Sequence, residues 1–213
     1  MYWSGLIFDL DGTVADTLPV SYAAFRRTIR EWTGATLTNA EIHGRFGPSE
    51  EGVLAGLLGG DPRTAYDLFL KLYALEHRRC PHAFPGLTEL IGEVRRAGVR
   101  CAIVTGKGAD AAAITLDRIG LAQAFERVEA GSAGGAVKLE CMQRVLADWG
   151  LPPERVASIG DFPSDVRAAR AAGLTPVGAA WASTANRAVL EEAGAEVVFD
   201  RVDQLASWLA QGC

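Results

Sequence analysis

Short apolar runs alternate with amphipathic segments over most of the second half of the chain. The apolar runs have the length of buried strands and lie at 99–105, 126–129, 155–160, 174–179 and 196–199, of which 126–129 has the weakest pattern. Helical spacing of apolar residues is found between them, at 87–97, 109–119, 139–149, 164–172, 184–193 and 203–210. This repetition predicts an α/β fold with a central parallel sheet and helices on both faces, which makes three layers.

Residues 17–82 interrupt this pattern because they contain no convincing strand. Apolar positions from Leu18 to Trp32 share one helix face, and Gly34 ends that helix. Three more helix starts are expected, at the capping box Thr38–Glu41, after the turn 47–49, and at Asp61-Pro62, the last helix running to about residue 79. We therefore expect a core of residues 1–16 and 83–213, with a helical cap domain at 17–82 inserted after the first strand.

Composition narrows the classes of partner. The chain has 213 residues, 49% hydrophobic and 22% charged, with a net charge of −5 and a pI near 5.3. These values are typical of a globular protein and disfavour nucleic-acid binding, which needs a basic face. The longest uncharged stretch, 171–186, is shorter than a membrane span and contains proline and glycine. We expect a cytoplasmic protein with neither a nucleic-acid nor a membrane partner, as a monomer or a homodimer.

Cysteine and histidine do not form a recognisable metal-binding pattern. The chain has four cysteines and three histidines, and their spacing matches no zinc site. They are Cys80, Cys101, Cys141, Cys213, His43, His77 and His82. We expect the cysteines to be free thiols in a reducing compartment.

Two carboxylates come directly after the first strand, Leu6-Ile7-Phe8. Asp9 and Asp11 are two residues apart, so both side chains start on the same face of the strand. Like charges this close repel each other unless a cation lies between them or one carboxyl holds a proton. Gly12 then ends the strand and allows the backbone to approach a ligand closely. The alternative is an ordinary strand that ends in an acidic turn.

The other unusual polar residues of the core also lie at strand ends or at helix starts. They are Thr105, Lys138, Asp161 and Asp165, and Gly106 beside Thr105 offers a backbone amide. Strand ends of a parallel sheet meet in one crevice, so we expect these side chains to gather around Asp9 and Asp11. Several carboxylates in a small space suit Mg²⁺, and a lysine, a hydroxyl and free backbone amides suit phosphate oxygens. The set predicts phosphoryl transfer to or from a carboxylate.

These residues resemble, in order, the four motifs of the haloacid dehalogenase-like (HAD) hydrolases. The motifs are Phe8-Asp9-Leu10-Asp11-Gly12-Thr13-Val14, then Thr105, then Lys138, then Gly160-Asp161-Phe162-Pro163-Ser164-Asp165. The resemblance covers nearly the whole chain, and the tail from Gly178 to Leu209 is most similar to the phosphoglycolate phosphatase branch. It implies a Rossmann-like core with a helical cap, and a magnesium-dependent phosphatase that hydrolyses a small phosphate monoester resembling phosphoglycolate.

The resemblance also implies a role for each motif residue. Asp9 would be the nucleophile that becomes an aspartyl phosphate, and Asp11 the general acid and base. Thr105, Gly106 and Lys138 would bind the transferred phosphoryl group. The Asp9 carboxylate, the Asp11 backbone carbonyl and Asp161 would hold Mg²⁺, with Asp165 in or just behind this set. Because dehalogenases of this family lack an acid at the position of Asp11, dehalogenation is not expected.

Departures from the family pattern leave some alternatives open. Gly106 replaces the Asn or Ser that relatives often have, and Leu139 replaces their Pro. Ser21 occupies the position at which related sugar-phosphate mutases have a histidine. The alternatives are a mutase or a pyrophosphatase on the same fold, or a non-catalytic phosphate-binding regulatory protein. In the cap, Arg45 is either a contact for a second anionic group of the substrate or an ordinary surface residue. Lys107 is either a second phosphate contact or an exposed residue, and we expect it to be exposed.

Overall fold

Six parallel strands form the centre of the molecule, of which the computed structural model describes residues 2–58 and 62–211. The strands are β1 (Gly5–Phe8), β2 (Arg100–Val104), β3 (Arg127–Glu129), β4 (Val156–Gly160), β5 (Thr175–Ala179) and β6 (Val197–Phe199). Their order is β3-β2-β1-β4-β5-β6, and each neighbouring pair is parallel. This sheet confirms the predicted α/β class.

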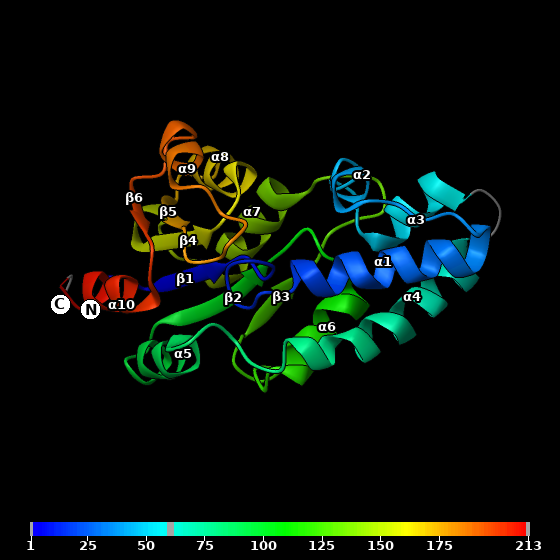
Figure 1. The fold of residues 1–213 in the computed structure, drawn as a ribbon. Coiled ribbons are helices and arrows are strands. Elements are labelled where there is room, and N and C mark those ends of the chain that lie inside the picture. The colour runs from blue at the N-terminus through cyan, green and yellow to red at the C-terminus, as the bar shows by residue number, and fades with distance from the viewer. Residues whose placement is uncertain (1, 59–61, 212–213) are drawn as a thin grey trace.

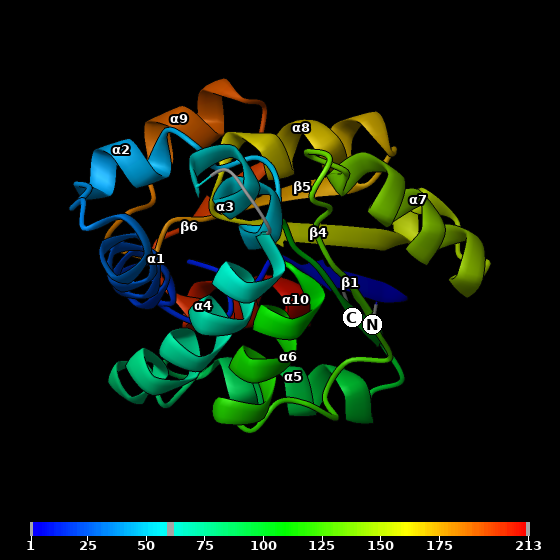
Figure 2. The same cartoon turned by 90° about the vertical axis from the view of Figure 1, so that its right-hand side faces the viewer.

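Helices cover both faces of the sheet, as Figure 2 shows. One face carries α5 (Leu87–Arg96), α6 (Ala109–Arg118) and α10 (Val202–Gln211), and the other carries α7 (Lys138–Trp149), α8 (Pro163–Ala171) and α9 (Arg187–Glu192). Successive residues of a strand point to opposite faces. Accordingly Leu6 and Phe8 belong to the apolar cluster on the α5 side, and Ile7 to the cluster on the α7 side. The three layers therefore follow from the apolar runs of the strands.

Residues 17–82 form a helical segment beyond the carboxyl ends of the strands (Figure 1). It consists of α1 (Leu18–Thr33), α2 (Asn39–His43), α3 (Glu50–Leu58), α4 (Pro62–Glu76) and the 3₁₀ turn η1 (His77–Arg79); a second such turn, η2 (Pro153–Arg155), precedes β4. The expected capping box at Thr38 is present, and Gly34 ends α1 in a left-handed conformation. The rings of Phe25 and Phe69, 4.6 Å apart, join α1 to α4. The expected N-cap Asp61 lies outside the described residues.

Two connections join the helical segment to the rest of the chain, and they lie against each other. The backbone N–H of Phe84 donates to the carbonyl of Val14, with 2.9 Å between nitrogen and oxygen. The indole N–H of Trp181 donates to the carbonyl of Thr13 at 3.0 Å. The two connections are therefore held to each other, and the first of them is also held to the loop that follows β5.

Two expectations about cysteines and membranes can be compared with the structure. Cys80, Cys101 and Cys141 are buried free thiols, whereas Cys213 lies outside the described residues. Within residues 2–58 and 62–211, no helix combines the length and the apolar character needed to cross a membrane.

Candidate active site

The carboxyl ends of β1, β2 and β4 open into one cavity of about 560 Å³ between the sheet and the helical segment. Asp9 follows β1, Thr105 follows β2 and Asp161 follows β4, and all three line this cavity. Asp11, Gly106 and Lys138 line it as well. The structure thus brings together the core residues that the strand ends were expected to gather.

Three carboxylates surround one end of this cavity. One oxygen each of Asp9, Asp161 and Asp165 lie within 4.8 Å of one another. Lys138, the first residue of α7, donates from Nζ to Asp9 Oδ1 at 2.9 Å and also to Asp165 Oδ1. Three buried carboxylates against one ammonium group leave an excess of negative charge, which fits a hard divalent cation such as Mg²⁺.

The pKa values at this end reflect burial and crowding. Burial raises the pKa of Asp9 to about 7, against the opposing charge of Lys138 and with further help from neighbouring carboxylates. Burial and the charges of Asp9 and Asp165 raise the pKa of Asp161 well above its ordinary value. Burial alone would lower the pKa of Lys138, but its two carboxylate partners outweigh this effect and raise it. Protons and a cation therefore compete for the same carboxylates.

In the turn after β1, there is no room for a side chain at Gly12. Its φ of +78° is left-handed, and a Cβ there would lie 2.2 Å from Asp161 Oδ2. The next residue, Thr13, donates from its hydroxyl to Asp161 Oδ1 at 3.1 Å. The backbone N–H of Asp9 donates to the carbonyl of Ile159 at 2.9 Å. These contacts fix the first and fourth motifs against each other.

The loop after β2 carries Thr105 and Gly106. The Thr105 hydroxyl is buried and accepts the backbone N–H of Lys107 at 3.2 Å. Gly131 packs so closely on this loop that a Cβ there would lie 2.0 Å from the Gly106 carbonyl oxygen. The N–H of Gly131 in turn donates to the carbonyl of Lys107 at 2.8 Å. The loop is therefore held by an internal hydrogen bond and by the segment at Gly131.

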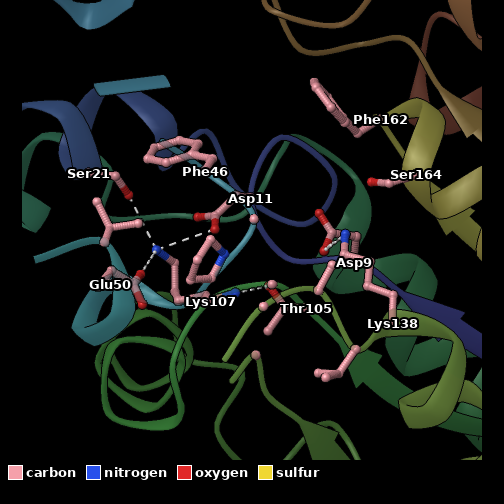
Figure 3. A pocket seen from close by; sticks show the side chains of 18 of the residues that line it. Asp9, Asp11, Ser21, Phe46, Glu50, Thr105, Lys107, Lys138, Phe162 and Ser164 are labelled. Atoms are coloured by element: carbon pink, nitrogen blue, oxygen red, sulfur yellow. Dashed lines mark hydrogen bonds and ion pairs between the residues drawn. The ribbon is translucent and has the colours of Figure 1, made fainter. Parts of the chain in front are cut away.

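Asp11 points away from Asp9 and toward Lys107 (Figure 3). Its Oδ2 lies 3.3 Å from Lys107 Nζ, and its Oδ1 accepts a hydrogen bond from the Thr17 hydroxyl. A ligand role for Asp11 would rest on its backbone carbonyl, as the family resemblance implies.

The expectation that Lys107 is exposed is wrong. Only 4% of the residue is accessible, and its Nζ lies 2.9 Å from Glu50 Oε1 and 3.2 Å from Ser21 Oγ. Burial alone would lower the pKa of Lys107, but the charges of Asp11 and Glu50 hold it well above its ordinary value. Sequence reasoning missed this group because Ser21 and Glu50 belong to the helical segment, and no spacing in the sequence relates them to Lys107.

The helical segment provides an apolar wall for the cavity, made mainly by Leu18, Phe25, His43, Phe46, Pro48 and Val53. Arg45 is exposed and does not line the cavity, although its neighbours Phe46 and Gly47 do. The His43 ring approaches the ring of Phe162 on the core, with 5.9 Å between centroids. The structure therefore does not bring Arg45 together with the other expected site residues.

Comparison with known proteins agrees with this architecture. The profile of the haloacid dehalogenase-like hydrolase family matches residues 6–179. A protein named phosphoglycolate phosphatase from Rhodospirillum rubrum is 30% identical over 96% of this chain and 90% of its own length. A protein of Mycobacterium tuberculosis named tyrosine-protein kinase PtkA is also 30% identical, over 83% of this chain and 62% of its own length.

Solved structures share the fold at lower sequence identity. A haloacid dehalogenase-like hydrolase from Streptococcus pneumoniae superposes with a TM-score of 0.78 and 23% identity, covering 98% of this chain and 99% of its own. The protein CbbY from Rhodobacter sphaeroides, solved with phosphate, gives a TM-score of 0.78 at 20% identity, with coverage of 95% and 96%. These structures confirm the α/β fold, and the family profile and the Rhodospirillum rubrum relative confirm the predicted family. This chain belongs to the haloacid dehalogenase-like hydrolases.

Proposed function

We propose that this protein is a magnesium-dependent phosphatase that hydrolyses a small phosphate monoester through an aspartyl phosphate. The observation that carries the proposal is the position of Asp9, held by Lys138 at the end of β1 beside Asp161 and Asp165. A second carboxyl, Asp11, lies two residues further on and outside this cluster. A protein that only binds phosphate has no need for a nucleophile paired with an acid.

The carboxylates of Asp9 and Asp161 and the backbone carbonyl of Asp11 would hold Mg²⁺, with Asp165 in or next to this set. A bound Mg²⁺ supplies positive charge to the phosphoryl oxygens and allows the crowded carboxylates to stay ionised. The hydroxyl of Thr105, the backbone N–H of Gly106 and the ammonium group of Lys138 would bind the remaining phosphoryl oxygens.

The reaction then takes two steps. Asp9 attacks phosphorus, the bond to the ester oxygen breaks, and Asp11 gives its proton to the departing alcohol. In the second step Asp11 takes a proton from water, the resulting hydroxide attacks phosphorus, and the Asp9 carboxylate is regenerated with release of inorganic phosphate. Asp11 thus ends each cycle protonated, as it began.

We further propose that residues 17–82 are a cap that closes over the cavity during the first step. In support, the cavity is lined from both sides, and the N–H of Ser49 donates to the carbonyl of Ser132 at 2.9 Å. Phosphoglycolate is the first substrate to test, because relatives carry the name phosphoglycolate phosphatase. Arg45, which is exposed and precedes the lining residue Phe46, would be a candidate partner for the carboxylate of such a substrate.

The test is phosphate release from a panel of monoesters and pyrophosphate, phosphoglycolate included, with Mg²⁺ or with EDTA. Asp9→Asn is the active-site variant, and Asp117→Asn, an exposed aspartate of α6, is the matched control. We expect turnover that requires Mg²⁺, is lost in Asp9→Asn and is kept in Asp117→Asn. Activity that appears only with a sugar bisphosphate activator would indicate a mutase instead, and no turnover of any ester would reject the proposal.

A further inference from the structure

The ammonium group of Lys107 is buried between the core and the helical segment, and the two-step reaction above does not use it. Its Nζ donates to Ser21 Oγ and to Glu50 Oε1, and it forms an ion pair with Asp11 Oδ2 at 3.3 Å. The ring of Tyr73 lies beneath it, with 4.6 Å from Nζ to the ring centroid. Two of its three N–H donors are therefore used within the protein, and two carboxylates already oppose its charge.

Glu50 extends this contact to the start of a core helix. Its Oε1 accepts from Lys107, and its Oε2 accepts from the backbone N–H of Gly108 at 2.7 Å. Gly108 is the N-cap of α6 and offers no side chain for this purpose. A carboxylate of the helical segment thus caps a core helix and fixes Lys107 at the same time.

Two neighbouring side chains, Thr17 and Lys107, orient the Asp11 carboxyl group. Thr17 donates to one carboxyl oxygen, and Lys107 contacts the other. Because Lys107 is held in turn by Glu50 and Ser21, which lie on α3 and α1, these contacts require the helical segment to be seated on the core. Figure 3 shows Lys107 between Ser21, Glu50 and Asp11.

We infer that Lys107 and Glu50 are positioning residues for the general acid: they aim the Asp11 carboxyl at the leaving oxygen only while the helical segment is seated. This inference rests on the proposed function and deepens it. The proton still passes from Asp11 to the leaving oxygen, and Lys107 neither gives nor takes one. Protonation of the leaving group would thereby be confined to the closed cavity, where the departing alcohol is shielded from water.

The test measures how kcat/KM depends on the leaving group. The value of kcat/KM depends on all steps from free substrate up to the first irreversible one, in which the alcohol departs. It therefore reports the acid role of Asp11. A 4-nitrophenolate leaves without protonation, whereas the alcohol of phosphoglycolate does not. The variants are Lys107→Met and Glu50→Gln, with Asp11→Asn as the reference for full loss of the acid and Lys71→Met, an exposed lysine of α4, as the control.

We expect Lys107→Met and Glu50→Gln to lower kcat/KM for phosphoglycolate at least tenfold more than for 4-nitrophenyl phosphate. The selective loss should stay within the 10²–10⁴-fold that a general acid contributes. Asp11→Asn should show the same selectivity to a larger extent, and Lys71→Met should show none. If Lys107→Met fails to fold, the result for Glu50→Gln tests the inference by itself. Glutamine has nearly the same volume as glutamate and keeps one oxygen that can accept the backbone N–H of Gly108.

Equal losses for the two esters, or no loss, would overturn the inference, since a merely structural role would affect both alike. This result is distinct from failure of the proposed function, in which the unaltered protein would hydrolyse neither ester.

Discussion

The crowding of Asp9, Asp161 and Asp165 dominates the electrostatics of the pocket at the scale of single residues. Each offers an oxygen within 4.8 Å of the others, and Lys138 balances only part of their charge. Repulsion of this kind destabilises the folded protein unless a cation or protons neutralise it. Stability in the absence of metal and affinity for metal are therefore opposed at these positions.

Asp161→Asn should stabilise the metal-free protein and remove its response to Mg²⁺. The change deletes one of the crowded charges, while the new amide oxygen can still accept the hydrogen bond from Thr13. A gain of about 1 kcal/mol in the free energy of unfolding corresponds to about 2–4 °C in Tm for a chain of this length. Thermal unfolding in EDTA and in excess Mg²⁺ would measure both effects, with Asp117→Asn as the control. A Mg²⁺-dependent rise in Tm equal to that of the unaltered protein would contradict a ligand role for Asp161.

Sequence reasoning located the core residues of the site but not the contacts of Lys107. Asp9, Thr105 and Asp161 could be expected to meet, because each directly follows a strand of the same parallel sheet. Glu50 lies 57 residues before Lys107, in a segment whose helices could be predicted singly but whose packing could not. The sequence does not distinguish an exposed lysine from a buried one unless the carboxylate that pairs with its ammonium group is known. The catalytic and metal-binding roles remain predictions.

At the scale of elements, the glycine-containing loop at 131–135 supports the loop after β2. Gly131→Ala should separate them, because the added Cβ would lie 2.0 Å from the Gly106 carbonyl oxygen. Overpacking of this kind costs about 1–3 kcal/mol, and we expect a loss of kcat/KM of at least tenfold as Thr105 and Gly106 move. Gly134→Ala is the matched control, since its Cβ would meet only the Ser132 hydroxyl at 3.6 Å. Measurement of Tm and kcat/KM would reject this role if the two variants behaved alike.

Element boundaries were predictable where a cap or a periodic pattern marks them. The helix expected at 184–193 is shorter in the structure, where α9 starts after Asn186, whose side chain accepts the N–H of Val189 at 3.3 Å. The preceding residues instead form the loop from which Trp181 reaches Thr13, a distant contact that helical spacing does not reveal. The weakest strand pattern, at 126–129, gave the short edge strand β3, which pairs with β2 alone.

At the scale of the whole molecule, a buried histidine connects the helical segment to α6. The His77 ring contacts the Cys80 carbonyl at 2.9 Å and the Thr115 hydroxyl at 3.1 Å, and the Tyr73 hydroxyl also contacts Thr115, at 2.8 Å. Burial lowers the pKa of His77 below its ordinary value of 6.5. The unfolded chain therefore takes up a proton at a pH where the folded protein does not.

It follows that His77 makes the free energy of unfolding fall as the pH drops below 6.5. His77→Gln carries no titrating group, so the stability difference between the unaltered protein and this variant should shrink from pH 7.5 to pH 5.5. Urea unfolding at each pH would measure the difference, and His82→Gln, at an exposed position, is the control. A difference that stays constant with pH would show that His77 is not the group responsible.

The hydrogen bond between Phe84 and Val14 has a consequence for how the pocket can open. Because the two connections to the helical segment are joined side by side, they would act together as one pivot for the proposed closure, and a rotation about it would displace each atom in proportion to its distance from the axis. Asp11 lies three residues from Val14 in the chain, whereas Phe46 and Glu50 line the cavity from the helical segment itself. A swing of the helical segment that admits substrate would therefore separate Ser21 and Glu50 from Lys107 and release the Asp11 side chain, while the Asp11 backbone stays beside Asp9.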